Sequence, residues 1–175
     1  YWLFLYLCNG MNVKDFCLLK WRNIDNDMMF YERAKTERSQ SDPKKIVVSL
    51  KAESKEIIKK WGCPSVNSEA FIFPHLNDKM SEVKKRATYQ QLTKIINKYI
   101  KEIAKEVGIN KNVTTYYARH SFATVLKRSG ANVQMISDLL GHSNINVTER
   151  YLSSFENEQI QEKTDSLTVG FKKGS

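Results

Sequence analysis

Apolar residues recur along most of this chain at the three- and four-residue spacing of a helix with one buried face. Glycine closes several of these segments, at Gly10, Gly62, Gly108 and Gly141, and glycine is a common residue just past a helix end. We therefore predict helices over residues 1–8, 13–21, 51–61, 89–107, 114–128, 132–140, 146–152 and 156–167.

Two segments favour strands instead. Residues 28–35 and 45–50 contain aromatic and β-branched residues, and the polar loop TERSQSDPK joins them. Residues 23–27 have turn-like composition, and residues 63–80 lack a period. No internal repeat or linker divides the chain. We predict one domain over residues 1–175, mainly α with a small antiparallel β-sheet.

The formal net charge of +9 adds a functional expectation. A globular domain this basic suits a polyanionic partner, with nucleic acid the first choice and an acidic membrane surface the second. The sequence has no apolar run of the length that spans a bilayer. Cys8, Cys17 and Cys63 fit no metal-binding spacing, so we expect reduced thiols in a cytoplasmic protein and no metal site.

The last third of the chain carries the candidate chemistry. Arg119 lies beside an apolar stripe in TTYYARHSFAT, with Tyr116 on the same helix face. A guanidinium at such an edge needs either an internal carboxylate or an external phosphate. His142 follows a helix end in LLGHS, and Tyr151 comes nine residues later. Taken singly, His142 is typical of a helix-end cap and Tyr151 of an ordinary aromatic residue.

Taken together, three segments resemble the tyrosine recombinase and phage integrase family: ARHSFAT at 118–124, LLGHSNINVTERY at 139–151, and Ala34, Lys35 and Thr36 on the predicted strand. The resemblance implies the tyrosine recombinase catalytic-domain fold and a phosphotyrosine mechanism. Tyr151 would attack the scissile phosphate and Arg119 would hold its oxygens. His142 would donate to the same phosphate or handle protons, and Lys35 would protonate the leaving 5′-hydroxyl. Such chemistry implies no cofactor, because the covalent link retains the bond energy.

Two positions depart from the family pattern. Asn12 stands where the family usually has its first arginine, and Tyr116 stands where it usually has histidine. These replacements are similar to those in integrases of conjugative and mobilisable transposons. Arg33 shares a face of the predicted strand with Lys35, so it can supply the missing charge or else contact the DNA backbone elsewhere. Arg38, on the following loop, is the second candidate.

The resemblance also implies double-stranded DNA as the partner and a homotetramer on DNA, formed by a protein that is monomeric when free. It implies that the chain is a fragment, the catalytic domain without an N-terminal core-binding domain. A DNA-binding protein that has lost cleavage and an enzyme that relaxes supercoils are the competing functions. The candidate DNA contacts are Arg33, Arg38, Lys44, Lys45, Lys84, Lys85, Arg86 and His120.

Overall fold

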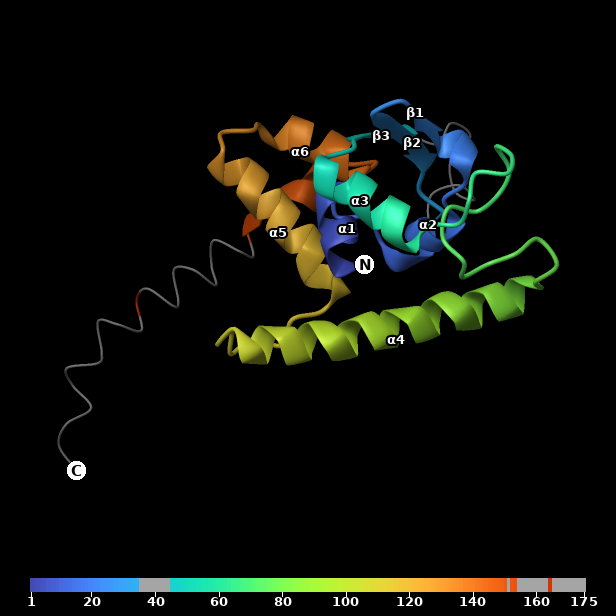
Figure 1. The fold of residues 1–175 in the computed structure, drawn as a ribbon. Helices are drawn as coiled ribbons and strands as arrows, with labels where there is room; N and C mark the ends of the chain where they lie inside the picture. The colour runs from blue at the N-terminus through green and yellow to red at the C-terminus, as the bar shows by residue number, and fades with distance from the viewer. Residues whose placement is uncertain (35–44, 151, 154–163, 165–175) are drawn as a thin grey trace.

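The computed structural model describes residues 1–34, 45–150, 152–153 and 164. Its helices are α1 (Trp2–Leu7), α2 (Val13–Leu18), α3 (Ala52–Trp61), α4 (Glu82–Glu106), α5 (Thr115–Arg128) and α6 (Val133–Leu140), with a short 3-10 helix η1 (Trp21–Asn23) (Figure 1). Residues 145–150 are also helical. The strands β1 (Ile24–Asp25), β2 (Met28–Glu32) and β3 (Lys45–Ser49) pair antiparallel in that order. The predicted fold class is therefore confirmed.

Aromatic packing places α1 at the centre of the molecule. Phe4 and Leu5 of this helix are fully buried. The Phe4 ring lies 5.3 Å from that of Phe73, which stacks at 4.2 Å on Phe16 of α2. α1 contacts α5 on one side and α3 on the other. Because these rings come from three separate segments, the core ties the start of the chain to the loop before α4.

The three-stranded sheet turns one apolar face inward. Met29 pairs with Val48 and Tyr31 with Ile46, and all four of these side chains are buried. α6 packs against β3. The end of α6 thereby comes close to Ile46 of β3, far away in sequence. None of the described helices combines the length and the hydropathy that crossing a bilayer requires.

Several predicted boundaries near the sheet were wrong. The helix predicted over 13–21 ends at Leu18, because the backbone of residues 20–22 turns to pair with residues 68–71 instead. Residues 24–25, predicted as turn, form β1 through pairing with β2. The strand predicted to reach residue 35 ends at Glu32.

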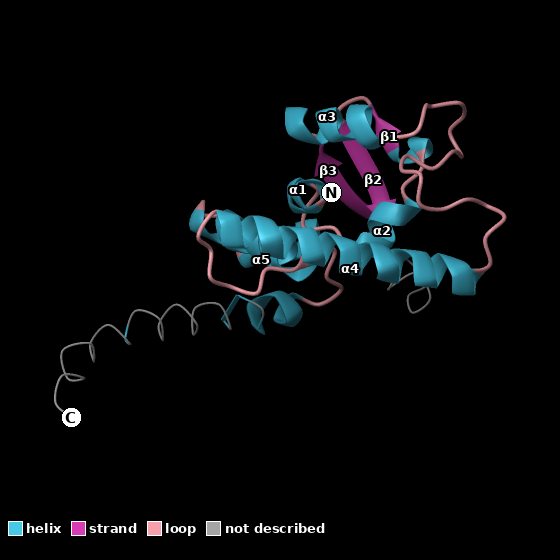
Figure 2. Cartoon of the chain, turned by 60° about the horizontal axis from the view of Figure 1, so that its bottom comes forward, coloured by secondary structure: helices cyan, strands magenta, loops and turns pink. Residues whose placement is uncertain are grey.

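The long helix α4 begins seven residues earlier than predicted. Ser81 caps it, accepting a hydrogen bond from the Lys84 backbone N–H. Residues 82–87 include no buried side chain, and Val83 is 80% exposed, so they show no apolar period. α4 lies at the edge of the molecule, on the side away from the sheet, and contacts α2 and α5 (Figures 1 and 2).

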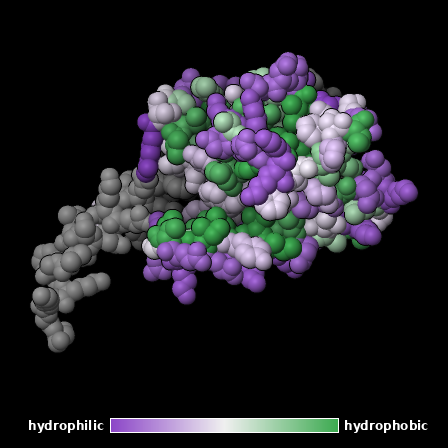
Figure 3. All heavy atoms as spheres, viewed as in Figure 1, coloured by the Kyte–Doolittle hydropathy of each residue, from purple (hydrophilic) through white to green (hydrophobic). Residues whose placement is uncertain are grey.

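The apolar face predicted for this long helix is only partly buried. Leu92 and Ile96 are buried, but Ile95, Tyr99 and Ile103 remain exposed. Hydrophobic side chains accordingly gather over part of α4 in Figure 3. The helix lies across the body at its edge and presents only a narrow stripe to α2 and α5.

Candidate active site

Arg119 lies on the buried face of α5, with only 9% of its surface exposed. Thr114 caps this helix, since its hydroxyl accepts a hydrogen bond from the Tyr116 N–H. One helical turn further on, the Arg119 guanidinium points into the body. Its Nη1 donates to the carbonyl oxygen of Gly10 at 3.0 Å, and its Nη2 donates to the carbonyl oxygen of Leu140. Both acceptors are backbone carbonyls rather than carboxylates. Arg119 therefore joins the α1–α2 turn to the end of α6.

The α1–α2 turn is shaped to admit this arginine. Gly10 has a φ of +62°, and a Cβ there would lie 2.6 Å from the Arg119 Cα. A side chain at this position would meet both backbone strain and the α5 backbone. The glycine is thus required for the close approach of α5 to the turn.

The end of α6 presents His142 beside Arg119. Gly141 closes the helix in the left-handed conformation, and the His142 N–H returns to the Ser137 carbonyl at 3.0 Å. The His142 Nδ1 lies 2.8 Å from the hydroxyl of Thr148, which is fully buried. This contact uses one ring nitrogen and thereby fixes the orientation of the other.

Arg33 reaches the same turn from the sheet. Its Nη1 donates to the Gly141 carbonyl at 3.2 Å, and its Cδ would lie 2.9 Å from a Cβ at Gly141. The strand-face argument was wrong, since β2 ends at Glu32 and Arg33 lies beyond it. The Arg33 side chain nevertheless reaches the turn that Arg119 binds, because Arg33 donates to the Gly141 carbonyl and Arg119 to the adjacent Leu140 carbonyl. Arg119, Arg33 and His142 therefore meet at residues 140–142.

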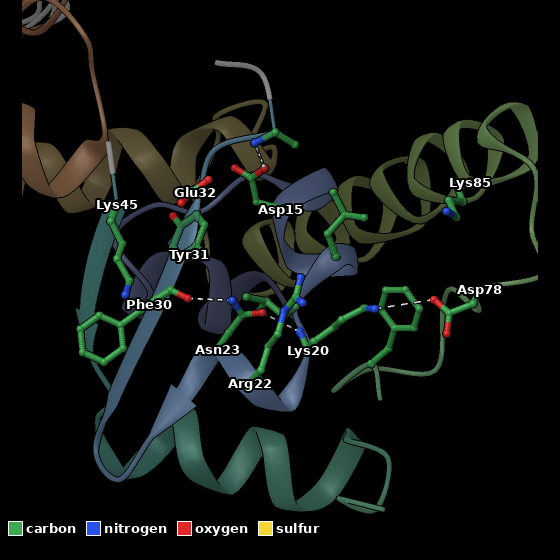
Figure 4. Close-up of a pocket in the computed structure, with 14 residues that line it drawn as sticks. Asp15, Lys20, Arg22, Asn23, Phe30, Tyr31, Glu32, Lys45, Asp78 and Lys85 are labelled. Atoms are coloured by element: carbon green, nitrogen blue, oxygen red, sulfur yellow. Dashed lines mark hydrogen bonds and ion pairs between the residues drawn. The ribbon is translucent and has the colours of Figure 1, made fainter. Parts of the chain in front are cut away.

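Asn12 has a local structural role. Its side chain caps α2 by accepting from the Asp15 N–H at 2.9 Å, and its amide donates to the Asp15 carboxylate. The other Asp15 oxygen accepts from the Ala34 N–H at 3.0 Å, the bond drawn as a dashed line at Asp15 in Figure 4. Burial raises the pKa of Asp15, and the bond from Ala34 and the charge of Arg33 oppose that shift. The Asn12 side chain is thus directed to Asp15.

Asp15 was missed in the sequence. It lies at the third helical position after an Asn cap, where acidic residues are common. From the sequence, this position predicts only a helix-capping role for Asp15. In the structure it links the start of α2 to Ala34, the residue before Lys35. Asp15, Arg119 and Arg33 also act electrostatically on the buried phenol of Tyr31. Burial raises the Tyr31 pKa, as does Asp15, while the two arginines lower it.

Tyr116 and His120 form one aromatic pair on α5. Their rings meet edge to face with centroids 4.1 Å apart, and Tyr116 is exposed. Burial, followed by the charge of Arg119, lowers the pKa of His120 to about 4. His120 is therefore neutral near pH 7 in the protein without DNA.

One cavity of about 260 Å³ brings part of the predicted site together. Asn12, Tyr116 and Arg119 all line it. Lys14, which sequence reasoning did not single out, lines the same cavity. A second cavity of about 490 Å³ between the sheet and α4 is lined by Lys45 and Lys85, two predicted DNA contacts (Figure 4).

The remaining candidates differ in setting. Lys84 and Arg86 are exposed on the first turns of α4. Among the described residues, no group of three or more Cys, His, Asp or Glu side chains could hold a metal ion. The predictions for four candidates lie outside the described residues: Lys35, Arg38, Lys44 and Tyr151.

Solved structures share this fold. The crystal structure of XerA recombinase superimposes with a TM-score of 0.58 at 20% identity, over 90% of this chain and 55% of that one. The Tn1549 transposon integrase in complex with transposon right end DNA gives a TM-score of 0.58 at 18% identity, over 91% of this chain and 57% of that one.

Sequence relatives match this chain at higher identity over shorter segments. Tyrosine recombinase XerD of Listeria monocytogenes serotype 4b is 48% identical over 54 residues, 31% of this chain and 18% of the relative. An integrase/recombinase of Escherichia coli is 36% identical over 77 residues, 44% of this chain and 22% of the relative. The matches thus span about a fifth of these relatives. Residues 2–158, most of the chain, match the model of the phage integrase family, so the chain belongs to that family.

Proposed function

We propose that this chain is the catalytic domain of a site-specific recombinase that cleaves and rejoins DNA strands through a 3′-phosphotyrosine intermediate. The observation that carries the proposal is the meeting of Arg119, Arg33 and His142 at residues 140–142. Two guanidinium groups and an imidazole around one turn form a site suited to the charge of a phosphate. The family relatives named as recombinases and integrases support the same activity.

The proposed reaction is two successive displacements at phosphorus. The Tyr151 hydroxyl gives its proton to His142 as its oxygen attacks the scissile phosphate, the bond to the 5′ oxygen breaks, and Lys35 gives that oxygen a proton. The product is a 3′-phosphotyrosine ester and a free 5′-hydroxyl. A 5′-hydroxyl from another strand then attacks the ester and releases the tyrosine. No nucleotide is consumed, since each step exchanges one phosphoester for another.

Charge stabilisation is the main demand on the site. The transition state places extra negative charge on the nonbridging oxygens, and donors fixed in advance stabilise it without reorganising. Arg119 is held by two carbonyls and is therefore oriented before DNA binds. We propose that Arg33 provides the second cation, because Asn12 is uncharged and directs its side chain to Asp15. Tyr116 would add a neutral hydroxyl donor.

The partner in this proposal is double-stranded DNA, bound by a protein that assembles into a tetramer when two sites are brought together. The net charge of +9 favours such a polyanion. Complexes of XerH recombinase with its difH substrate provide a structural parallel. We expect the protein to act in the cytoplasm, where the DNA of a mobile element is accessible.

A trapping experiment tests the proposal. The full-length protein is mixed with nicked duplexes tiled across the DNA that flanks its own coding sequence. Cleavage beside a nick lets a short fragment diffuse away, so the protein remains covalently attached and runs as a shifted band. We expect an adduct with the wild type and none with Tyr151→Phe, which lacks only the hydroxyl and should bind DNA normally. An adduct formed by Tyr151→Phe would contradict the assigned nucleophile.

The alternative is a DNA-binding protein that has lost cleavage. One observation favours it: the Asn12 side chain is engaged with Asp15 and contributes no charge to the site. The same experiment separates the two functions, because a protein of this kind would bind the duplexes and yield no adduct on any of them.

A further inference from the structure

Two neighbouring cavities border α2 and α4. The first, of about 260 Å³, contains Arg119 and Tyr116 at one end. The second, of about 370 Å³, contains Arg86 at the start of α4. Lys14 and Tyr89 line both. The two hollows are therefore parts of one groove, which we call the α2–α4 groove, running from the candidate active site to the first turns of α4.

Two cations of this groove, Lys14 and Arg86, differ in their partners from three cations of the neighbouring surface. Lys20, Arg22 and Lys85 each lie within 3.2 Å of a carboxylate oxygen, and Figure 4 shows Lys20 directed toward Asp78. Within residues 1–34 and 45–150, by contrast, neither Lys14 nor Arg86 forms an ion pair. A cation already paired with a carboxylate gains less from a phosphate, because the existing contact must be given up.

Lys14 is also held in place. Its Nζ lies 3.4 Å from the Ala34 carbonyl oxygen, a neutral acceptor. Its charge also acts on Asp15, but that carboxylate is buried and bound to Ala34 and Asn12, and it forms no ion pair with Lys14. Glu82 lines the far end of the groove, but its carboxylate is 2.9 Å from the Lys85 ammonium. The groove thus presents positive charge at two points along its length.

The groove's lining is mixed in character. Apolar surface predominates beside Arg119, and the hydroxyl-bearing residues Thr93, Thr115 and Tyr116 interrupt it. In a nucleic-acid strand the phosphates are separated by sugars, so cations separated by apolar and hydroxyl-bearing side chains suit such a strand. Contacts to phosphate and sugar are the sequence-independent part of DNA recognition.

We propose that the α2–α4 groove binds the sugar-phosphate backbone of duplex DNA next to the scissile phosphate, with Lys14 and Arg86 each contacting one phosphate. The inference rests on the proposed function, because it takes Arg119 as the ligand of the scissile phosphate at the near end. Lys14 would then hold the strand between the reaction centre and α4.

Salt dependence of binding measures these contacts directly. Each phosphate that a protein cation neutralises adds about 0.9 to the slope of log affinity against log salt. The full-length protein is titrated with a duplex of arbitrary sequence from about 50 to about 200 mM salt. We expect Lys14→Gln and Arg86→Gln each to lower the slope by about 0.9, and the double variant by about 1.8. Lys14→Arg should keep the wild-type slope, because it preserves the charge.

Lys55→Gln is the matched control. Lys55 is on α3 and pairs with Asp27, so this variant loses the same charge without touching the groove and should keep the wild-type slope. Slopes for Lys14→Gln and Arg86→Gln that equal the control would overturn the inference. Adduct formation by the wild type in that case would leave the proposed function standing. Lowered slopes without any covalent adduct would instead support DNA binding in the groove and refute the proposed recombinase activity.

Discussion

Replacing Gly10 with alanine should displace Arg119, because the structure leaves no room for a methyl group at this turn. Gly10 has a φ of +62°, and an added Cβ would lie 2.6 Å from the Arg119 Cα and 3.0 Å from its Cβ. The left-handed conformation costs alanine about 1–2 kcal/mol. The contact is with backbone, which cannot rotate away, so overpacking should add about 1–3 kcal/mol.

The control is Gly108→Ala. Gly108 also has a positive φ, +77°, but nothing lies within 4 Å of its added Cβ, so this variant meets only the conformational cost. The difference between the two variants isolates the contact with α5. At about 2–4 °C per kcal/mol for a domain of this size, Gly10→Ala should melt roughly 2–12 °C below Gly108→Ala.

Thermal unfolding followed by circular dichroism measures this difference, and adduct formation on nicked DNA measures its effect on the site. A shift of about 1 Å in a catalytic group can lower a rate about a hundredfold, so Gly10→Ala should form adduct about that much more slowly than Gly108→Ala. Equal melting temperatures for the two variants would refute the claim that the turn and α5 meet at this glycine.

Three further outcomes are expected. Arg33→Ala should slow adduct formation by about a hundredfold to a thousandfold while DNA binding changes little, and adding Asn12→Arg to this variant should partly restore adduct formation. Normal cleavage by Arg33→Ala together with loss of cleavage in Arg38→Ala would show that the loop arginine supplies the second cation. Asp15→Asn should set an amide against the Asn12 amide and lower the free energy of unfolding by about 1–3 kcal/mol, which a urea titration would reveal and an unchanged midpoint would contradict. The His120 pKa falls from 6.5 to about 4 on folding, so the unfolded chain takes up a proton first as the pH drops through this window. Between pH 6.5 and about 4 the free energy of unfolding of the wild type should therefore fall relative to that of His120→Gln. Parallel profiles of unfolding free energy against pH for the two proteins would contradict this prediction.

Local pattern was sufficient for the helices that bury a continuous stripe. The segments that became α3, α5 and α6 show apolar spacing and ends marked by Gly62, Gly130 and Gly141. The sequence pattern failed to predict elements that bury no apolar stripe or that form only by pairing with another strand. The first turns of α4 bury nothing, and β1 is a strand only because Ile24 pairs with Met29. A strand of two residues carries no period of its own.

The sequence by itself determined the family and the residue types of the site. ARHSFAT and LLGHS are contiguous motifs, so they can be recognised without knowing how the chain folds. Only the tertiary structure decided which groups meet. Arg33 and Gly141 are separated by 108 residues and Arg119 and Gly10 by 109, and the contacts depend on α6 packing against β3 and on α1 packing against α5. The same packing directs Asn12 to Asp15 and leaves Lys14 in the groove. Side-chain direction over such separations follows from how the elements pack, which no local spacing encodes.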